Sequence, residues 1–451
     1  MILSLMPLAL ILVLLAIFSV DRILKLVVFL TPLSLPLSEL VYGLSFDMFL
    51  PTEPLLFGIL LLFVIRVVSD RGFDREILLH PVSLVIWFYL FWTFVTSLTS
   101  TMPLVSIKFL LVRIWFIVGF YLLAIRLFET KRNTSVFIWL YVISLLLVIG
   151  YTIGRHSGYG LLNKQAAHWV MTPFFNDHTS YGAVMAMFIP FLVFFSFRGE
   201  SGSTMRWVSR GVLLILLVAF VLSYTRAAWL SLILAAGVWV LIRLRIRFRT
   251  MMYSLVSVLS IVFLFQKQIL EYLEKNDDES SSNLVEHFSS MSNITSDASN
   301  LERLNRWGAA VRMFHDKPVF GFGPGTYMFK YAPYQLSRDR TIISTNMGDA
   351  GNAHSEYLGP LAESGFLGLI SMVMLVIVVM YTAITTYSRL NDSDHKGLVL
   401  SAFLALVTYY AHGLMNNFLD TDKAAVPFWG FTAMIVLLDL KSRGIFPREW
   451  K

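Results

Sequence analysis

Three side chains in the second half of the chain have the chemistry to act on an anionic substrate. Arg226 lies in VLSYTRAAWL, Arg303 in LERLNRW, and His354 in GDAGNAHSEYLGPLAESGFLG. A guanidinium donates two parallel hydrogen bonds to phosphate oxygens, and an imidazole can accept a proton from an attacking hydroxyl or hold that hydroxyl in line. These residue types therefore predict phosphate binding combined with proton transfer.

Each of these residues also has a plainer interpretation. Arg226 lies where one apolar run ends and another begins, so it could snorkel to the membrane interface or bind an anion beside a helix N-terminus. Arg303 and Arg306 lie one turn apart on a predicted helix with an apolar stripe, which also fits a helix lying on the membrane surface. We expect Arg303 to point inward and Arg306 to lie further toward the polar face. A lone histidine such as His354 is more often structural than catalytic.

Further polar residues are secondary candidates for substrate binding. Arg113 lies about 12 Å below the outer end of its predicted helix at 1.5 Å per residue, and arginines at such depth usually line a cavity. Asn176, Asp177 and His178 precede another predicted helix, where helix capping explains them equally well. A later segment, YYAHGLMNNFLDTD, offers amide and carboxylate side chains that suit sugar hydroxyls and loops alike.

Asn352 and Glu356 flank His354 and complete the set of secondary candidates. His354 and Glu356 form an H-x-E pair, but the chain has no P-C-x-x-C, no H-E-x-x-H and no cysteine. We therefore expect neither a metal nor another cofactor. The glycines and the proline around this segment predict a bent entry into the membrane, which is possible only where the backbone lines protein or water.

The elements that position these residues are membrane helices. The chain has 451 residues, of which 57% are hydrophobic and 14% charged, well below the roughly 25% charged residues of soluble domains. Its apolar runs are long enough to cross a bilayer core about 30 Å thick and must then be helical. We predict an all-α polytopic membrane protein with 12–13 transmembrane helices, at residues 2–20, 25–42, 53–68, 81–99, 105–127, 134–153, 181–197, 208–224, 227–243, 251–265, 359–385, 397–415 and 424–440.

Basic residues set the predicted orientation. They gather in alternate connections, which are therefore cytoplasmic, and this distribution explains the net charge of +7 without a nucleic-acid partner. Residues 1–265 then form about ten N-terminal transmembrane helices, including the external loop 154–180. Residues 266–358 form a large periplasmic loop, serine-rich at first and then helical over 300–316. Residues 359–451 contain the C-terminal transmembrane helices and a cytoplasmic tail.

A series of motifs resembles a known family. The order SYTRAAW, ERLNRW, KPVFGFGPGTY and NAHSEYLGPLAESGFLG resembles the O-antigen ligase and O-antigen polymerase superfamily of bacterial membrane glycosyltransferases. The resemblance covers about residues 176–440. One departure is Ser-Tyr-Thr-Arg, where many relatives have adjoining Ser and Arg. The resemblance implies a GT-C-type helical fold in the bacterial cytoplasmic membrane and an active site that faces the periplasm.

The same resemblance implies a reaction and its participants. Such enzymes move a glycan from a polyprenyl diphosphate carrier, such as undecaprenyl diphosphate, onto a glycan, lipid or protein hydroxyl without a metal or nucleotide sugar, and we expect inversion at the anomeric carbon. Position by position, Arg226, Arg303 and His354 fall on the catalytic residues of the family. The diphosphate is then expected to contact Arg226, Arg303 and Arg306. Polymerase, lipid A core ligase and protein O-oligosaccharyltransferase share these residues.

A transporter or flippase of lipid-linked glycans is the alternative function. Many helices and intramembrane basic residues would also suit substrate passage, and transporters often contain inverted repeats and broken helices. No repeat is visible in this sequence, and the polar candidates gather on one predicted face. A site that opens to one side favours an enzyme.

Overall fold

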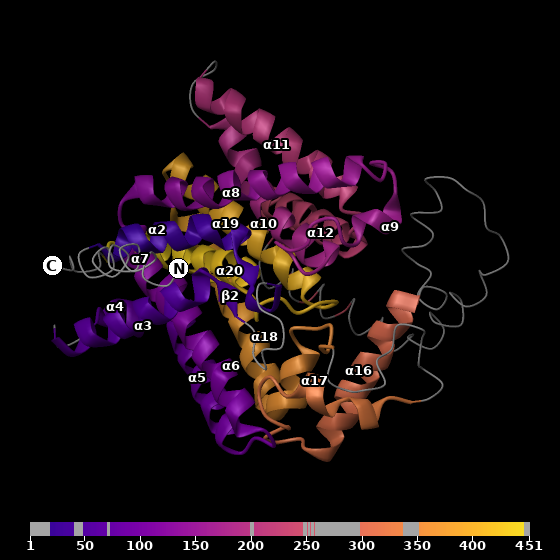
Figure 1. The fold of residues 1–451 in the computed structure, drawn as a ribbon. Coiled ribbons are helices and arrows are strands. Elements are labelled where there is room, and N and C mark those ends of the chain that lie inside the picture. Colours follow the sequence, from indigo (N-terminus) through magenta and orange to yellow (C-terminus); the bar gives the residue numbers. More distant parts are fainter. Residues whose placement is uncertain are drawn as a thin grey trace, which may run out of the picture.

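The computed structural model describes residues 19–39, 48–69, 73–198, 203–246, 250, 253, 257, 298–336 and 351–445. Its described secondary structure is almost entirely helical, and nine of the described helices are long and apolar enough to cross a membrane (Figure 1). The predicted class, an all-α polytopic membrane protein, is therefore confirmed. Nearly all of the predicted helices 2–20 and 251–265 lies outside the described residues, as does the serine-rich segment. The total of 12–13 helices stays a prediction.

The first half of the described chain forms closely spaced helices and one short two-stranded sheet. Its elements are α2 (Val20–Leu30), η1 (Thr31–Leu33), β1 (Leu35–Pro36), η2 (Leu37–Glu39), β2 (Phe49–Leu50), α3 (Thr52–Ser69), α4 (Arg75–Leu78), α5 (Pro81–Leu98), α6 (Pro103–Ile117), the π-helical η3 (Val118–Leu123), α7 (Ala124–Leu127), α8 (Lys131–Ser157), α9 (Lys164–Ala167) and α10 (His178–Phe197).

The second half contains the longest described helix and the elements around it. They are α11 (Thr204–Leu222), α12 (Arg226–Arg243), α16 (Ala298–Asp316), α17 (Tyr327–Lys330), η4 (Ala332–Tyr334), α18 (Leu358–Arg389), α19 (Ser393–His412) and α20 (Asp422–Ser442). The predicted span 397–415 corresponds to α19, which is not among the nine described helices that are long and apolar enough to cross a membrane.

The predicted helix 25–42 is wrong in its extent. Helix α2 ends at Leu30, because Pro32 and Pro36 cannot donate the backbone hydrogen bonds that would continue it. The chain turns instead through η1 into β1, which pairs antiparallel with β2 so that Leu35 lies opposite Leu50. An apolar run can therefore be long enough to span a membrane and still be interrupted by prolines.

Helix α18 is bent at Gly365, beyond the glycines and the proline from which a bent entry was predicted. Gly365 has φ 69° and ψ −165°, and a Cβ atom there would lie 2.1 Å from the carbonyl oxygen of Val319. The GFGPG turn fills the break, since Phe366 N–H donates to the Pro318 carbonyl at 3.0 Å and Phe322 N–H donates to that of Ala362 at 3.2 Å. Backbone groups freed by the break thus find partners inside the protein, as a membrane-spanning segment requires.

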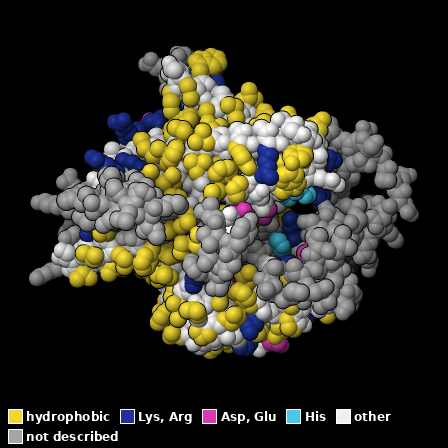
Figure 2. Space-filling model, in the orientation of Figure 1, with side chains coloured by type: hydrophobic (Ala, Val, Ile, Leu, Met, Phe, Trp, Pro, Cys, Tyr) yellow, Lys and Arg dark blue, Asp and Glu magenta, His cyan; other side chains and the backbone are white. Residues whose placement is uncertain are grey.

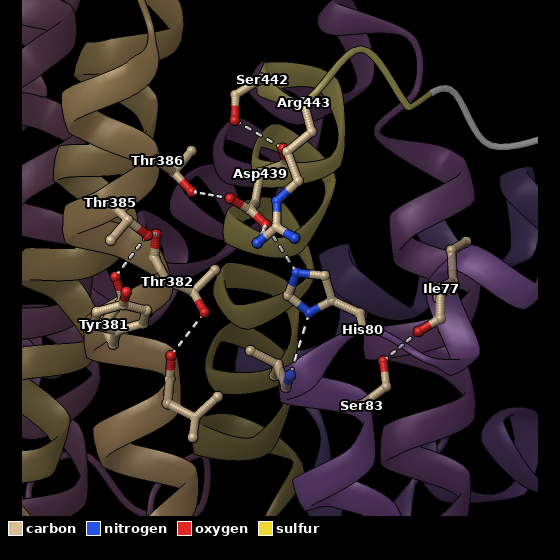
Figure 3. A network of polar contacts seen from close by, with 12 residues as sticks. Ile77, His80, Ser83, Tyr381, Thr382, Thr385, Thr386, Asp439, Ser442 and Arg443 are labelled. Carbon is tan, nitrogen blue, oxygen red and sulfur yellow. Dashed lines mark hydrogen bonds and ion pairs between the residues drawn. The ribbon is translucent and has the colours of Figure 1, made fainter.

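The far end of α18 is anchored by a buried aspartate (Figure 3). Asp439 of α20 is 0% exposed, and its carboxylate accepts from Thr386 Oγ1 at 2.8 Å and Arg389 NH1 at 2.9 Å, both on α18. His80, at the start of α5, lies 3.0 Å from the other oxygen, and Arg443 also reaches it at 2.6 Å. A buried carboxylate needs such partners, so this network ties α5, α18 and α20 together.

Ion pairs join three of the predicted cytoplasmic connections at one end of the helices. Asp394, at the start of α19, pairs with Lys131 of α8 at 3.0 Å and with Arg198 after α10 at 2.8 Å. The opposite helix ends carry α9, the start of α12, and α16, and in Figure 1 α9 and α16 lie on the right while α4 and α7 lie on the left. We call the end with α9 and α16 the site face, because it holds the candidate residues.

Candidate functional site

A tight corner between α11 and α12 presents Arg226. Tyr224 has a positive φ of 49°, which turns the chain, and Thr225 then precedes the first residue of α12. The Thr225 hydroxyl donates to the carbonyl of His178 at 2.7 Å, so the starts of α12 and α10 are joined. Gly182 permits this contact, since a Cβ there would lie 2.8 Å from Thr225. Arg226 and His178 are consequently held at the same corner.

Helix α16 carries Arg303 and Arg306, and their environments differ from the sequence-based expectation. Arg306 is only 4% exposed and therefore does not lie on a polar face. Its Nε donates to Glu302 at 2.6 Å, and its guanidinium stacks on Tyr331 at 4.8 Å. Arg303 is half-buried. Helical spacing predicts an apolar stripe of Leu304, Trp307, Val311 and Phe314 on this helix. That prediction is wrong in part, since Val311 is 39% exposed. Besides Met313, the fully buried side of α16 is formed by small and polar residues, namely Glu302, Asn305, Arg306, Ala309 and Ala310.

The segment 351–357 places His354 against α16. Arg306 NH1 donates to the Asn352 carbonyl at 3.1 Å, and Trp307 Nε1 donates to the His354 carbonyl at 3.2 Å. Gly351 has φ 145°, and a Cβ there would lie 1.7 Å from the Arg306 guanidinium. His354 itself has a positive φ of 48°, a conformation that costs free energy in a non-glycine residue and often marks a functional position. Arg306 therefore positions the histidine segment.

Electrostatic contacts bring the three predicted catalytic residues together. The positive charge of Arg303 interacts electrostatically with His178, His354 and His412, and that of Arg226 interacts with His178. We call these five residues the cationic cluster. In Figure 2, histidine, basic and acidic side chains gather in one recessed area of the surface shown.

The protonation state of His354 follows from this environment. Burial, and then the positive charges of Arg306 and Arg303, lower the pKa of His354 to about 4, against opposing effects of Asn416 and Asp177. Positive neighbours disfavour a second positive charge. Near neutral pH the imidazole is therefore uncharged and has a nitrogen lone pair available for a proton or a hydroxyl hydrogen.

The end of α19 and the turn after it pack against the cationic cluster. Asn416 is buried, hydrogen-bonds His354, and lies 3.1 Å from His412 Nε2. The backbone of Ala227, next to Arg226, also lies in hydrogen-bond range of His412. Both His412 and Asn416 belong to the YYAHGLMNNFLDTD segment, which the sequence indicated only as generally polar. Its tertiary position gives these two side chains a specific role beside His354.

The loop before α10 contributes one histidine that sequence reasoning missed. His168 stacks on His178 with ring centroids 4.2 Å apart and an interplanar angle of 4°. Asp177 is the N-cap of α10 and accepts from Ser180 N–H at 2.7 Å, so the capping interpretation holds, although its charge also acts on His354. Asn176 is exposed. The signal that could have found His168 was a second histidine in the same short loop.

Arg113 and Glu356 are not members of the cationic cluster and have well-defined partners elsewhere. The Arg113 guanidinium donates to the carbonyl of Leu419 and to the carboxylate of Asp420. One oxygen of Glu356, which is 5% exposed, accepts from Tyr409 Oη at 2.6 Å and from the backbone N–H groups of Phe418 and Leu419. Both side chains stabilise the turn between α19 and α20, so their main role is structural.

A comparison with known protein families finds a match that lies mostly in the second half of the chain. Residues 211–373 match a family model described as O-antigen ligase, and no curated protein matches the chain. The matched region contains Arg226, Arg303 and His354, whereas His178 and His412 lie outside it. In the part of the chain that the structure describes, no group of three or more His, Asp or Glu side chains could hold a metal ion.

Proposed function

We propose that this chain, which the match over residues 211–373 identifies as a member of the O-antigen ligase superfamily, transfers a glycan from a polyprenyl diphosphate carrier to an acceptor hydroxyl at the site face. The observation that carries the proposal is the cationic cluster. Three elements far apart in the sequence, α12, α16 and the segment before α18, contribute Arg226, Arg303 and His354 to it. Holding two guanidinium groups beside the same histidine adds little stability to a membrane protein, so the proximity of Arg226 and Arg303 favours an anionic ligand.

Arg226 and Arg303 bind the diphosphate in this mechanism. The bond between the anomeric carbon and the diphosphate oxygen breaks with its electron pair going to the diphosphate, so negative charge grows there in the transition state. Fixed guanidinium groups stabilise that charge more strongly than they stabilise the ground state. Arg306 supports the site indirectly, because its guanidinium is committed to Glu302 and to the segment that carries His354.

His354 acts on the acceptor. The acceptor oxygen forms a new bond to the anomeric carbon, and its proton passes to a nitrogen of the neutral imidazole. Because the lowered pKa of about 4 makes His354 a weak base, holding the hydroxyl in line contributes alongside proton transfer. Attack opposite the leaving diphosphate inverts the configuration at the anomeric carbon. We propose that this reaction needs no metal.

The experiment that tests this function is a reconstituted transfer assay. The full chain in lipid vesicles receives an undecaprenyl diphosphate oligosaccharide with candidate glycan, lipid and protein acceptors, and the release of undecaprenyl diphosphate is followed together with product formation. Arg226→Ala should abolish turnover while the protein stays folded, and His354→Ala should lower turnover severely. Chelators should have no effect.

Two outcomes would overturn the proposal. Full activity in both variants would remove the site assignment, and inhibition by a chelator that one divalent ion reverses would remove the metal-free mechanism. Movement of the intact lipid-linked oligosaccharide across the vesicle membrane, without cleavage of its diphosphate bond, would favour a flippase instead.

A further inference from the structure

A second polar region lies on the other side of the segment that carries His354. A cavity of about 100 Å³ is lined mainly by α5, α6, α18 and α20, and we call it the α5–α18 cavity. Asn352, Ala353 and Ser355, the neighbours of His354, line one end of it. Met372 and Trp429 line the other end, deeper along α18 and α20. The cavity is thus polar beside the histidine segment and apolar below.

The charge of this cavity is opposite to that of the cationic cluster. Three carboxylates line it, those of Glu356, Glu363 and Asp420, against a single guanidinium, that of Arg113. Glu363 accepts from the backbone N–H of Tyr327 at 2.9 Å, and the other two carboxylates have the partners described above. A diphosphate would be repelled here. A neutral ligand would not.

Three buried polar atoms on the lining side chains have no partner among the described residues. They are Arg113 Nε, Asn417 Oδ1 and Trp429 Nε1, which amount to two donors and one acceptor. Arg113 is 5% exposed and Trp429 1% exposed. Buried polar groups are rarely left without partners, and each one costs free energy until a ligand or water satisfies it. Hydroxyl groups suit this set because each hydroxyl both donates and accepts.

We propose that the α5–α18 cavity binds the terminal sugar of the acceptor. This inference rests on the proposed glycan transfer. Sugar hydroxyls accept from Arg113 Nε and Trp429 Nε1 and donate to Asn417 Oδ1, while the rings of Tyr89 and Phe109 form apolar walls. The sugar presents one hydroxyl to His354 past Asn352 and Ser355. The donor diphosphate lies on the other side of the histidine segment, so the two substrates approach His354 from different sides.

Asn417→Leu provides the kinetic test. In the reconstituted assay, with a panel of methyl hexopyranosides as acceptor probes, this variant should raise the acceptor KM about tenfold, the effect of one lost hydrogen bond. The donor KM and the hydrolysis of the donor by water should change less than about twofold on the same reasoning. Asn417→Asp, which keeps the acceptor oxygen, should restore most of the transfer. Asn133→Leu makes the same change on the opposite face, beside the Leu127 carbonyl, and should behave as the unmodified protein.

Photolabelling tests the cavity independently of turnover. A methyl hexopyranoside that bears a diazirine should label peptides around residues 89–113 or 417–429, unlabelled methyl hexopyranoside should compete, and Asn417→Leu should reduce the labelling. Labelling elsewhere, or none that competes, would show that the cavity holds only water and would overturn the inference. Equal loss of donor hydrolysis and transfer in Asn417→Leu would overturn it too. If the unmodified protein cleaves no donor while saturable labelling persists, the proposed function fails but the sugar site stands.

Discussion

The cationic cluster and the α5–α18 cavity lie on two sides of one short segment and use their charged residues differently. In the cavity, Arg113 is paired with Asp420, and Glu356 accepts three hydrogen bonds. In the cluster, Arg303 acts on three histidines at once. The ion pair and the hydrogen bonds of the cavity build a rigid wall, whereas the two guanidinium groups of the cluster act on the same histidine, which supports the proposed anionic ligand. The difference separates residues that shape the site from residues that would act on substrate.

The largest expected effect is a loss of stability when Arg306, which positions the segment that carries His354, is removed. Arg306→Ala should destabilise the protein by about 3–5 kcal/mol, because the buried Glu302 would lose its ion pair with Arg306. Thermal or denaturant unfolding in detergent measures this change. The double variant Arg306→Ala with Glu302→Ala should be less destabilised than Arg306→Ala alone. A stable Arg306→Ala protein that has lost activity would instead move Arg306 into the group that binds the diphosphate.

Arg303, one turn away, should behave in the opposite manner. Arg303→Ala should lower turnover about 10²–10³-fold, the range for losing one group that stabilises transition-state charge, with little change in stability. Donor hydrolysis should fall equally, because the diphosphate leaves in both reactions. Arg312→Ala is the matched control on the same helix, where Arg312 donates to the Tyr334 carbonyl. Equal activity in Arg303→Ala and Arg312→Ala would contradict a specific role of Arg303 in turnover.

The pH dependence of turnover tests the histidine. Because the pKa of His354 is lowered to about 4, turnover should stay high from pH 8 to about pH 5 and fall as the pH drops through about 4. Asp177 raises this pKa, so Asp177→Asn should move the acid limb to still lower pH. A pH–rate profile of both proteins measures the shift. A limb near pH 6.5 in the unmodified protein would contradict the charged environment described here.

The stability of the folded protein should also decrease as the pH falls. An unfolded His354 with an ordinary pKa binds protons at a higher pH than the folded one, so its contribution to stability is present above about pH 6.5 and is lost as the pH falls toward 4. Unfolding midpoints of the unmodified protein and His354→Gln, measured across this range, should converge at low pH. Parallel curves would show that His354 does not titrate differently on folding.

The smallest expected effect concerns the cap of α10. Asp177→Ala should cost about 1 kcal/mol, because the Ser180 N–H loses its side-chain acceptor. Asp177→Asn retains an N-cap oxygen and should be nearly neutral in unfolding experiments. If Asp177→Asn lowered turnover as strongly as Arg303→Ala, Asp177 would belong to the catalytic group and the capping interpretation would be incomplete.

Periodicity and residue type predicted much of the fold. They failed where a proline or a glycine interrupts a helix and changes the direction of the chain. The helix bounds from α10 to α12 agree with the predicted spans to within four residues, since long apolar runs must be helical in lipid. The predicted helix 25–42 failed because prolines divide it, and the bend in α18 lies at Gly365 because the GFGPG turn packs into that position. Such contacts join distant segments and leave no local pattern.

The sequence by itself determined the class of protein and predicted the family resemblance and the three side chains of the leading hypothesis, because hydrophobic length and motif order are local properties. Only the tertiary structure decided what each charge does. Arg306 and Glu356 looked like ligands for substrate, yet a buried charge must find its partners within the protein, and those partners come from other helices. Asn416 gained its importance in the same way, from His354, which is distant in the chain.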